Sequence, residues 1–342
     1  MDVCIQPRRL SGAVTPPPSK SMAHRAVLAL TLSDGVGDLF NVEDSQDIQA
    51  TKRCVEALKT SRPTGALPLL DCGESGSTLR FLIPIALAVA GGGVFTGRGR
   101  LMERPQQPYF DIFEEKGIHY ERKDGALLVR GTLAPGTYRL PGNVSSQFVS
   151  GLLFALPLLG DDSTLTVQTP VESAGYIRMT VEALQQSGII IEETAPFSWR
   201  IPGRQTYQAH SGSLSGDYSQ AAVLLCAGAL GHEVTVTGLM TQTTQGDRAV
   251  LKHLAALGAE VTEDERGITV RGNNLHGAML DMHDCPDIAP VLALTCQLAQ
   301  GESRLTGCGR LRLKECDRLA ATVELLNALG GKARAEGDDI VV

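Results

Sequence analysis

Glycines that follow helical patterns recur at a nearly constant spacing along this 342-residue chain. One series closes the stretches "FEEKG", "LQQSG", "LAALG" and "LNALG", at Gly117, Gly188, Gly258 and Gly330, with spacings of 71, 70 and 72 residues. A second series ends a different apolar helix at Gly91, Gly160, Gly231 and Gly301, with spacings of 69, 71 and 70 residues. A fixed period of self-similarity is typical of repeat architectures. Two series with one period therefore predict copies of a single structural unit.

The segments between these glycines predict what each unit contains. A Leu- and Ala-rich helix is followed by a glycine turn and a β-rich run such as "STLTV", "HEVTVTG" or "ESRLTG". A second amphipathic helix ends in Gly, where only a residue without a Cβ adopts the left-handed cap at no steric cost. A hairpin such as "IHYERKDGALLVRG" closes the unit. The unit is therefore βαβαββ, and the chain is predicted to be α/β (α+β), with sheets covered by helices.

Five such units can be placed in the sequence. We expect their helix pairs over residues 20–60, 75–117, 145–188, 217–258 and 287–330. The first unit is short, because "RPTGALPLLD" leaves little room for a hairpin. The fifth reaches Val342 inside its last hairpin strand, about one residue before the closing glycine of the other units. A chain that stops within a strand is expected to have been cut.

Composition limits the class of protein. The chain is 43% hydrophobic and 20% charged, which is typical of globular proteins, and its apolar runs are interrupted by glycine and too short to span a bilayer. A net charge of −7 argues against a nucleic-acid surface. Eight scattered cysteines, without CxxC or metal-like spacing, indicate buried thiols in a reducing compartment. We therefore expect a cytoplasmic protein.

Polar clusters stand at the same place in each repeat, just before its first helix. They read "SKSMAHR", "CGESGSTLR", "GNVSSQF", "SGDYSQ" and "DCPDIAP". Small hydroxyl or acidic residues at helix starts are often only N-caps, and Asp217 is our candidate for a pure cap. Ser145, Ser146 and Gln147 offer more donors than a cap needs. These clusters are therefore candidates for binding as well as for capping.

The first cluster follows three prolines and predicts a helix that begins near Ser19. Unpaired amides and the helix dipole favour an anion at such an end, and Lys20, Ser21 and Arg25 would surround it. Taken alone, this segment is better explained as an ordinary capped helix with solvated cations. It is not a Walker A loop, because the glycines of that motif are absent.

Two further segments carry groups of charged residues. "RLMERPQQP" places Arg104 before a proline, where a guanidinium fork suits a carboxylate or a phosphate. "LRLKECDRLAA" gathers Lys314, Glu315 and Arg318 at a helix start, and Asp287 belongs to the same repeat. A solvated helix end is the simpler interpretation of this run. Two carboxylates among several cations are also a plausible acid and base pair.

Seven segments, in order and spacing, resemble the motifs of the 5-enolpyruvylshikimate-3-phosphate (EPSP) synthases. They are "PPPSKSMAHRAVLAL", "CGESGSTLRFL", "RLMERPQQP", "GNVSSQFVSGLL", "ESAGYIRMT", "DMHDCPDIA" and "LRLKECDRL". The resemblance implies an enolpyruvyl transferase fold of two domains, each with three βαβαββ repeats and the active site between them. Residues 14–214 would form the upper domain, and residues 1–13 with 215–342 the lower domain. Five of the expected six repeats are then present, and the third repeat of the lower domain is missing.

The resemblance also implies an activity and its residues. The family transfers the enolpyruvyl group of phosphoenolpyruvate to the 5-hydroxyl of shikimate 3-phosphate, as a 3-phosphoshikimate 1-carboxyvinyltransferase. Asp287, Glu315 and Lys20 would be catalytic. The contacts implied for shikimate 3-phosphate are Lys20, Ser21, Arg25, Ser145, Ser146, Gln147, Ser173, Tyr176, Asp287 and Lys314. Those implied for phosphoenolpyruvate are Lys20, Gly76, Arg104, Gln147 and Arg318.

By the same resemblance, the reaction needs no metal and no organic cofactor. The partners would be the two substrates, with no nucleic acid and no membrane, and the protein would be a monomer. Two alternatives remain open. One is the sister enzyme that acts on UDP-N-acetylglucosamine, which typically uses a cysteine shortly before the arginine that corresponds to Arg104, whereas no cysteine lies between Cys72 and Cys226. The other is an inactive binding fragment, because of the shortened end.

Overall fold

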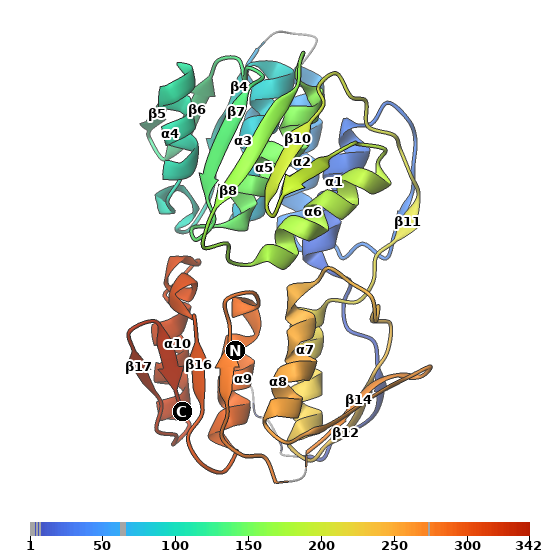
Figure 1. The fold of residues 1–342 in the computed structure, drawn as a ribbon, viewed down its shortest axis with the longest axis vertical. Coiled ribbons are helices and arrows are strands. Elements are labelled where there is room, and N and C mark those ends of the chain that lie inside the picture. Colours follow the sequence, from blue (N-terminus) through green and yellow to red (C-terminus); the bar gives the residue numbers. More distant parts are fainter. Residues whose placement is uncertain (1–3, 5, 7, 62–65, 273) are drawn as a thin grey trace. The chain divides into compact units, whose positions relative to one another are not determined.

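The computed structural model describes residues 4, 6, 8–61, 66–272 and 274–342 (Figure 1). The chain divides into two compact units, which are described separately. Unit 1 contains Met1–Pro18 and Ser215–Val342, and unit 2 contains Ser19–Leu214. None of the helices in the described part of the chain has the length and hydropathy that a membrane span requires.

Unit 2 consists of three helix pairs with their sheets. The helices are α1 (Lys20–Leu32), α2 (Gln46–Ser61), α3 (Gly76–Ala90), α4 (Gln107–Lys116), α5 (Ser146–Ala155) and α6 (Ala174–Gln186), with the 3-10 turns η2 (Leu101–Glu103) and η3 (Leu156–Leu158). The strands are β2 (Leu39–Phe40), β3 (Leu69–Asp71), β4 (Gly92–Thr96), β5 (His119–Lys123), β6 (Ala126–Arg130), β7 (Thr137–Pro141), β8 (Ser163–Gln168), β9 (Glu192–Ala195), β10 (Ser198–Ile201) and β11 (Gly212–Ser213).

The sheets of unit 2 follow one pattern. Their orders are β3-β4-β6-β5 and β7-β8-β10-β9, and in each the first two strands are parallel and the hairpin is antiparallel. Parallel neighbours need a crossover, which α3 and α5 supply. The β5–β6 hairpin turns through Asp124 and Gly125, both with positive φ, as a two-residue turn of this kind requires. The predicted βαβαββ unit is confirmed.

The first repeat differs from the others in unit 2. Its strand β2 pairs in parallel with β11, which lies about 170 residues later and completes a two-stranded sheet. Part of the expected short connection, residues 62–65, lies outside the described residues.

Unit 1 contains two repeats, and the first of them is discontinuous in sequence. Its elements are β1 (Ser11–Val14), α7 (Tyr218–Ala229), β12 (Glu233–Val236), η4 (Gly246–Ala249), α8 (Val250–Ala256), β13 (Glu260–Asp264), β14 (Gly267–Arg271), β15 (Met279–Asp281), η5 (Pro286–Ile288), α9 (Ala289–Gln297), β16 (Arg304–Thr306), η6 (Gly309–Leu313), α10 (Arg318–Ala328), β17 (Arg334–Glu336) and β18 (Asp339–Val341). The sheet orders are β1-β12-β14-β13 and β15-β16-β18-β17. Strand β1 pairs with β12, and Pro18 forms a β-bridge with Gly216, so the segment up to Pro18 lies in unit 1. Unit 2 therefore begins at Ser19 and not at residue 14, where the expected upper domain begins.

Most of the predicted glycine caps occur where the period places them. Gly91 and Gly117 are left-handed C-caps, and five others in the two series also have positive φ: Gly188, Gly231, Gly258, Gly301 and Gly330. Gly160 is the exception. Helix α5 ends at Ala155 and passes into η3, and Leu159 caps that turn in an extended conformation. The expectation of a glycine cap at this position was therefore wrong.

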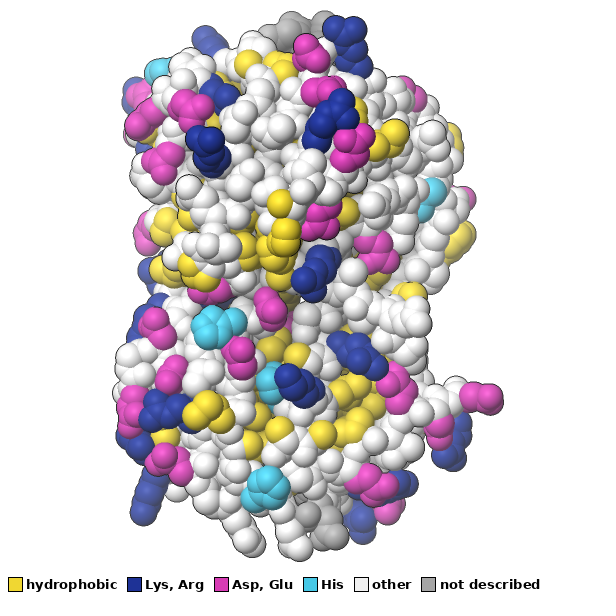
Figure 2. Space-filling model, in the orientation of Figure 1, with side chains coloured by type: hydrophobic (Ala, Val, Ile, Leu, Met, Phe, Trp, Pro, Cys, Tyr) yellow, Lys and Arg dark blue, Asp and Glu magenta, His cyan; other side chains and the backbone are white. Residues whose placement is uncertain are grey.

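The cysteines also differ in part from expectation. All eight are free; six are buried, whereas Cys4 and Cys316 are exposed. On the face shown in Figure 2, Lys and Arg side chains are mixed with Asp and Glu on each unit. This mixture is consistent with the modest net charge of −7.

Candidate active site

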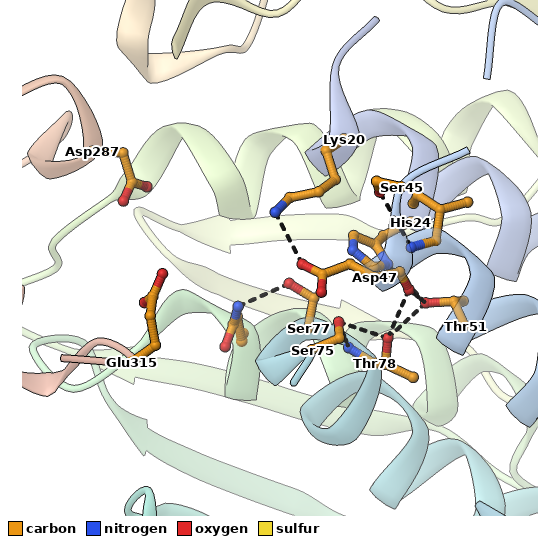
Figure 3. A network of polar contacts seen from close by, with 12 residues as sticks. Lys20, His24, Ser45, Asp47, Thr51, Ser75, Ser77, Thr78, Asp287 and Glu315 are labelled. Atoms are coloured by element: carbon orange, nitrogen blue, oxygen red, sulfur yellow. Dashed lines mark hydrogen bonds and ion pairs between the residues drawn. The ribbon is translucent and has the colours of Figure 1, made fainter. Parts of the chain in front are cut away.

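The start of α1 is capped as its sequence predicts. The Ser19 hydroxyl accepts a hydrogen bond from the Met22 amide, and the helix begins at Lys20. The Lys20 ammonium forms an ion pair with Asp47 at the start of α2, with an Nζ to Oδ2 distance of 2.9 Å (Figure 3). Lys20 is half exposed, so the pair contributes little to stability. It holds the ammonium in place where α1 begins.

Arg25 lies one turn further along α1 and is buried, with 3% of its surface exposed. Its Nε donates to the Thr180 hydroxyl at 2.8 Å, and Nη1 donates to the Ser21 carbonyl at 2.7 Å. Its Nη2 donates to the Ser150 hydroxyl and to the Tyr176 carbonyl. Burial lowers the pKa of Arg25 to about 10, so the group stays charged at neutral pH. A buried cation thus joins α1 to α5 and α6 without a carboxylate partner among these bonds.

A chain of buried polar groups lies behind Lys20. His24 Nδ1 is 2.8 Å from the Thr51 hydroxyl, which in turn is 2.7 Å from the Thr78 hydroxyl (Figure 3). Thr78 then donates to Ser75, the N-cap of α3. Burial lowers the pKa of His24 to about 3, so its imidazole is neutral at physiological pH. The chain connects α1, α2 and α3 through neutral groups.

Gly76 is the first residue of α3 and lies against a cation. A Cβ at this position would be 2.5 Å from Nη1 of Arg104. Glycine therefore allows the Arg104 guanidinium to approach the start of the helix closely. The resemblance implies that both residues contact phosphoenolpyruvate, and the structure brings them together.

The remaining predicted residues of unit 2 lie at the starts of α5 and α6. Ser145 caps α5, and the side chain of Gln147 bonds to Arg80 and Ser77. Ser146 begins α5 and is buried. Ser173 precedes α6 in a left-handed conformation, with φ of 54°, and its side chain does not cap the helix. Backbone strain at a buried serine is a feature found at binding sites.

In unit 1, one carboxylate joins two cations. Asp287 Oδ1 is 3.0 Å from Nζ of Lys314 and 3.0 Å from Nη1 of Arg318. Arg318 Nη2 also forms an ion pair with Glu315. Burial alone would raise the pKa of Glu315, but a backbone N–H and the Arg318 guanidinium outweigh it and lower the pKa below its usual value. The four charged residues that the sequence grouped in this repeat therefore form one cluster.

A buried carboxyl that the sequence did not single out lies near this cluster. Asp247, on η4, is 3% exposed and accepts a hydrogen bond from the Ser219 hydroxyl on α7. Burial raises its pKa to about 7, and the negative charge of Asp287 adds to the shift. Asp247 can therefore exchange a proton near neutral pH. The predicted cap, Asp217, accepts the Gln220 amide at the start of α7.

Two residues of unit 2 were also missed. Asp47 holds Lys20, and its only sequence signal is its place in the first turn of α2. Arg80 contacts Gln147 and the Pro105 carbonyl. It belongs to the quoted segment "CGESGSTLR" and follows Gly76 by one helical turn, so its spacing could have indicated the shared face.

Comparison with known proteins assigns the chain to a family. The family model described as EPSP synthase (3-phosphoshikimate 1-carboxyvinyltransferase) matches residues 5–342. The chain belongs to the EPSP synthase family. Curated relatives named 3-phosphoshikimate 1-carboxyvinyltransferase include those of Clostridium kluyveri, 39% identical, and Clostridium perfringens strain 13, 40% identical. Each match covers 99% of this chain and 84% of the relative.

Solved structures share the fold of this EPSP synthase family member. The EPSP synthase of Acinetobacter baumannii superposes with a TM-score of 0.76 at 22% identity, over 97% of this chain and 81% of that one. The enolpyruvyl transferase NikO of Streptomyces tendae gives a TM-score of 0.72 at 17% identity, over 98% and 82% of the two chains. The predicted family and fold class are confirmed, whereas the residue assignments and the missing repeat stay predictions.

Proposed function

We propose that this chain transfers the enolpyruvyl (1-carboxyvinyl) group of phosphoenolpyruvate to the 5-hydroxyl of shikimate 3-phosphate. Its curated relatives are named 3-phosphoshikimate 1-carboxyvinyltransferase, which supports this proposal. The observation that carries the proposal is Asp287, a partly buried carboxylate held by both Lys314 and Arg318. A carboxylate and an ammonium in contact can move a proton to and from a reacting group. Two anionic substrates also require nearby cations, and both units provide them.

The reaction divides naturally into two steps. The 5-hydroxyl adds to C2 of phosphoenolpyruvate and loses its proton, while the methylene carbon C3 gains one. The tetrahedral intermediate then loses phosphate from C2 and a proton from C3, which restores the double bond. We assign the proton transfers to Asp287, Glu315 and Lys20. Asp287 forms an ion pair with Lys314, and Lys20 forms one with Asp47.

The geometry of unit 2 supports the binding assignments that the resemblance implies. The serine hydroxyls at the start of α5, at Ser145 and Ser146, suit the 3-phosphate of shikimate. The Arg104 guanidinium beside Gly76 suits the carboxylate or phosphate of phosphoenolpyruvate. Arg25 donates through four N–H groups to protein oxygens, so we assign it mainly to fixing the position of Ser21 and Tyr176.

Units 2 and 1 would be the upper and lower domains, and the protein would act as a cytoplasmic monomer. Eight free thiols suit a reducing compartment. The family model and the names of the curated relatives favour the reaction of shikimate 3-phosphate over the sister reaction on UDP-N-acetylglucosamine.

Phosphate release tests the proposal. With shikimate 3-phosphate and phosphoenolpyruvate together, the chain should release phosphate, and neither substrate alone should suffice. UDP-N-acetylglucosamine in place of shikimate 3-phosphate should give none. Release only with the nucleotide sugar would support the alternative, and binding of shikimate 3-phosphate without any release would indicate an inactive fragment.

A further inference from the structure

Arg80 connects three segments of unit 2 that the proposed site uses. It lies on α3 and is 4% exposed. Its Nη1 donates to Oε1 of Gln147 on α5 at 2.8 Å, and its Nη2 donates to the carbonyl of Pro105 at 3.0 Å. The guanidinium also lies 4.7 Å from the ring centre of Phe148. A buried planar cation is thus fixed by hydrogen bonds and by an aromatic ring.

These contacts determine how the Gln147 amide is oriented. Arginine has five N–H donors and no acceptor, so the amide atom that faces it must be the oxygen. The nitrogen Nε2 then points the other way and donates to the Ser77 hydroxyl at 2.9 Å. A flipped amide would place the N–H groups of Gln147 against the N–H groups of the guanidinium. Neither set of donors would then have an acceptor in the other. Arg80 therefore makes one orientation of the amide strongly preferred.

The orientation matters because the proposed ligands are anions. Nε2 of Gln147 carries two N–H groups, and within the described part of the chain it donates only one of them, to Ser77. The second is available to a carboxylate or phosphate oxygen. With the amide flipped, the oxygen would occupy this side and repel an anion.

The same arginine holds the backbone next to a second proposed ligand contact. Pro105 follows Arg104, and its carbonyl accepts from Arg80 while the carbonyl of Arg104 accepts from Arg122 at 3.4 Å. This fixes the peptide from which the Arg104 guanidinium reaches Gly76.

We propose that Arg80 is a positioning residue for phosphoenolpyruvate, which orients the Gln147 amide as a donor and fixes the Arg104–Pro105 peptide. The inference rests on the proposed function and deepens it. Arg80 itself need not touch substrate, because its two terminal nitrogens donate to protein oxygens.

Steady-state kinetics of Arg80→Met and Arg80→Lys test the proposal. Arg80→Met has a side chain of similar length but no donor, and we expect the KM for phosphoenolpyruvate to rise about 10- to 100-fold, the loss associated with a hydrogen bond to a charged group. Arg80→Lys retains the charge and one hydrogen bond but cannot reach Gln147 and Pro105 together. Its KM for phosphoenolpyruvate should therefore lie between that of the parent and that of Arg80→Met. The KM for shikimate 3-phosphate should change much less.

A double-mutant cycle separates positioning from simple structural damage. If Arg80 acts through Gln147, Arg80→Met should add little to the defect of Gln147→Ala. Arg304→Met is the matched control, because Arg304 bonds to Glu336 and Asp339 in unit 1, and its loss should affect stability but not KM. If Arg80→Met does not fold, Arg80→Lys alone carries the test.

The outcomes distinguish the inference from the function on which it rests. An active parent chain with unchanged KM in a folded Arg80 variant would overturn the inference alone. Full additivity with Gln147→Ala would overturn the role of the amide. A parent chain that releases no phosphate would count against the proposed function, and the inference would fall with it.

Discussion

The two units hold the cations of their candidate sites in different ways. In unit 2, the bonds described for Arg25 and Arg80 go to hydroxyl, carbonyl and amide oxygens. In unit 1, Lys314 and Arg318 bond to the carboxylates of Asp287 and Glu315. A neutral acceptor does not offset the positive charge of a cation that bonds to it, whereas a carboxylate does. We therefore expect the cations of unit 2 to act mainly in attracting anions, and the cluster of unit 1 to act mainly in proton transfer.

Lys20 qualifies this comparison. It lies in unit 2, yet it forms an ion pair with the Asp47 carboxylate, as the cations of unit 1 do with theirs. The proposed catalytic role of Lys20 agrees with this difference, because the other proposed proton-transfer groups also lie in ion pairs. The contrast therefore follows the proposed role of each charged group, positioning or proton transfer, and not only the unit in which the group lies.

The largest expected effect is the loss of a carboxylate from unit 1. Asp287→Ala removes the group that joins Lys314 and Arg318, and we expect kcat to fall about 10²- to 10⁴-fold, the usual contribution of a general acid or base. Lys20→Ala should give a similar loss. Phosphate release at saturating substrate measures both.

Asp162→Ala is the control for Asp287→Ala. Asp162 pairs with Arg200 on the exposed surface of unit 2, and its removal should leave kcat unchanged. Full activity of Asp287→Ala would contradict the assignment of proton transfer to unit 1.

The next effect should appear in binding by unit 2. Arg25→Met removes a buried charge that lacks a carboxylate partner among its described bonds. We expect the Kd for shikimate 3-phosphate to rise at least about 10-fold, because Ser21 and the start of α6 lose a charged donor. Isothermal titration calorimetry of folded protein measures this change.

Arg318→Met supplies the opposite case for the comparison. Arg318 compensates Asp287 and Glu315, so its loss should reduce kcat and change the Kd for shikimate 3-phosphate little. Equal effects of the two substitutions on Kd would remove the distinction between the units.

The sequence predicted the fold well because the period itself encodes it. Helix pairs, hairpins and seven of the eight glycine caps occur where the 70-residue spacing placed them. Gly160 failed because a helix that continues as a 3-10 turn no longer needs a left-handed cap. The two exposed cysteines were missed because burial of a thiol depends on tertiary packing and not on spacing.

Clusters were easier to predict than the residues that support them. Lys314, Glu315 and Arg318 are adjacent in sequence, and equivalent positions in the repeats drew attention to Ser145 and Lys20. Arg80 and its acceptor Gln147 are 67 residues apart, and no local pattern connects them. Asp247 follows no cap or helix pattern, because it lies on a 3-10 turn.

A smaller effect is expected where Gly76 meets Arg104. In Gly76→Ala the new Cβ would lie 2.5 Å from Nη1 of Arg104, so the end of a flexible side chain must move while the fold is kept. We expect the KM for phosphoenolpyruvate to rise about 10-fold, as for a weakened charged hydrogen bond. Gly160→Ala is the control, because nothing lies within 4 Å of a Cβ there. An unchanged KM in Gly76→Ala would separate Arg104 from substrate binding.

The smallest effect concerns Asp247 and the pH dependence of stability. Burial raises its pKa from 3.8 to about 7 in the folded protein, so between these values the folded state binds a proton that the unfolded state has lost. Stability attributable to this group therefore falls as the pH rises through this range and stays low above it. Asp247→Asn cannot ionise, yet its amide oxygen can still accept from Ser219. Its Tm relative to the parent should therefore increase between pH 5 and pH 8.

Asp162→Asn should show no such trend, because the backbone amide of Gly203 and the Arg200 guanidinium hold the pKa of Asp162 below its usual value. A constant difference in Tm between Asp247→Asn and the parent would mean that this carboxyl does not titrate near neutral pH, and proton exchange in unit 1 would then be confined to the cluster around Asp287.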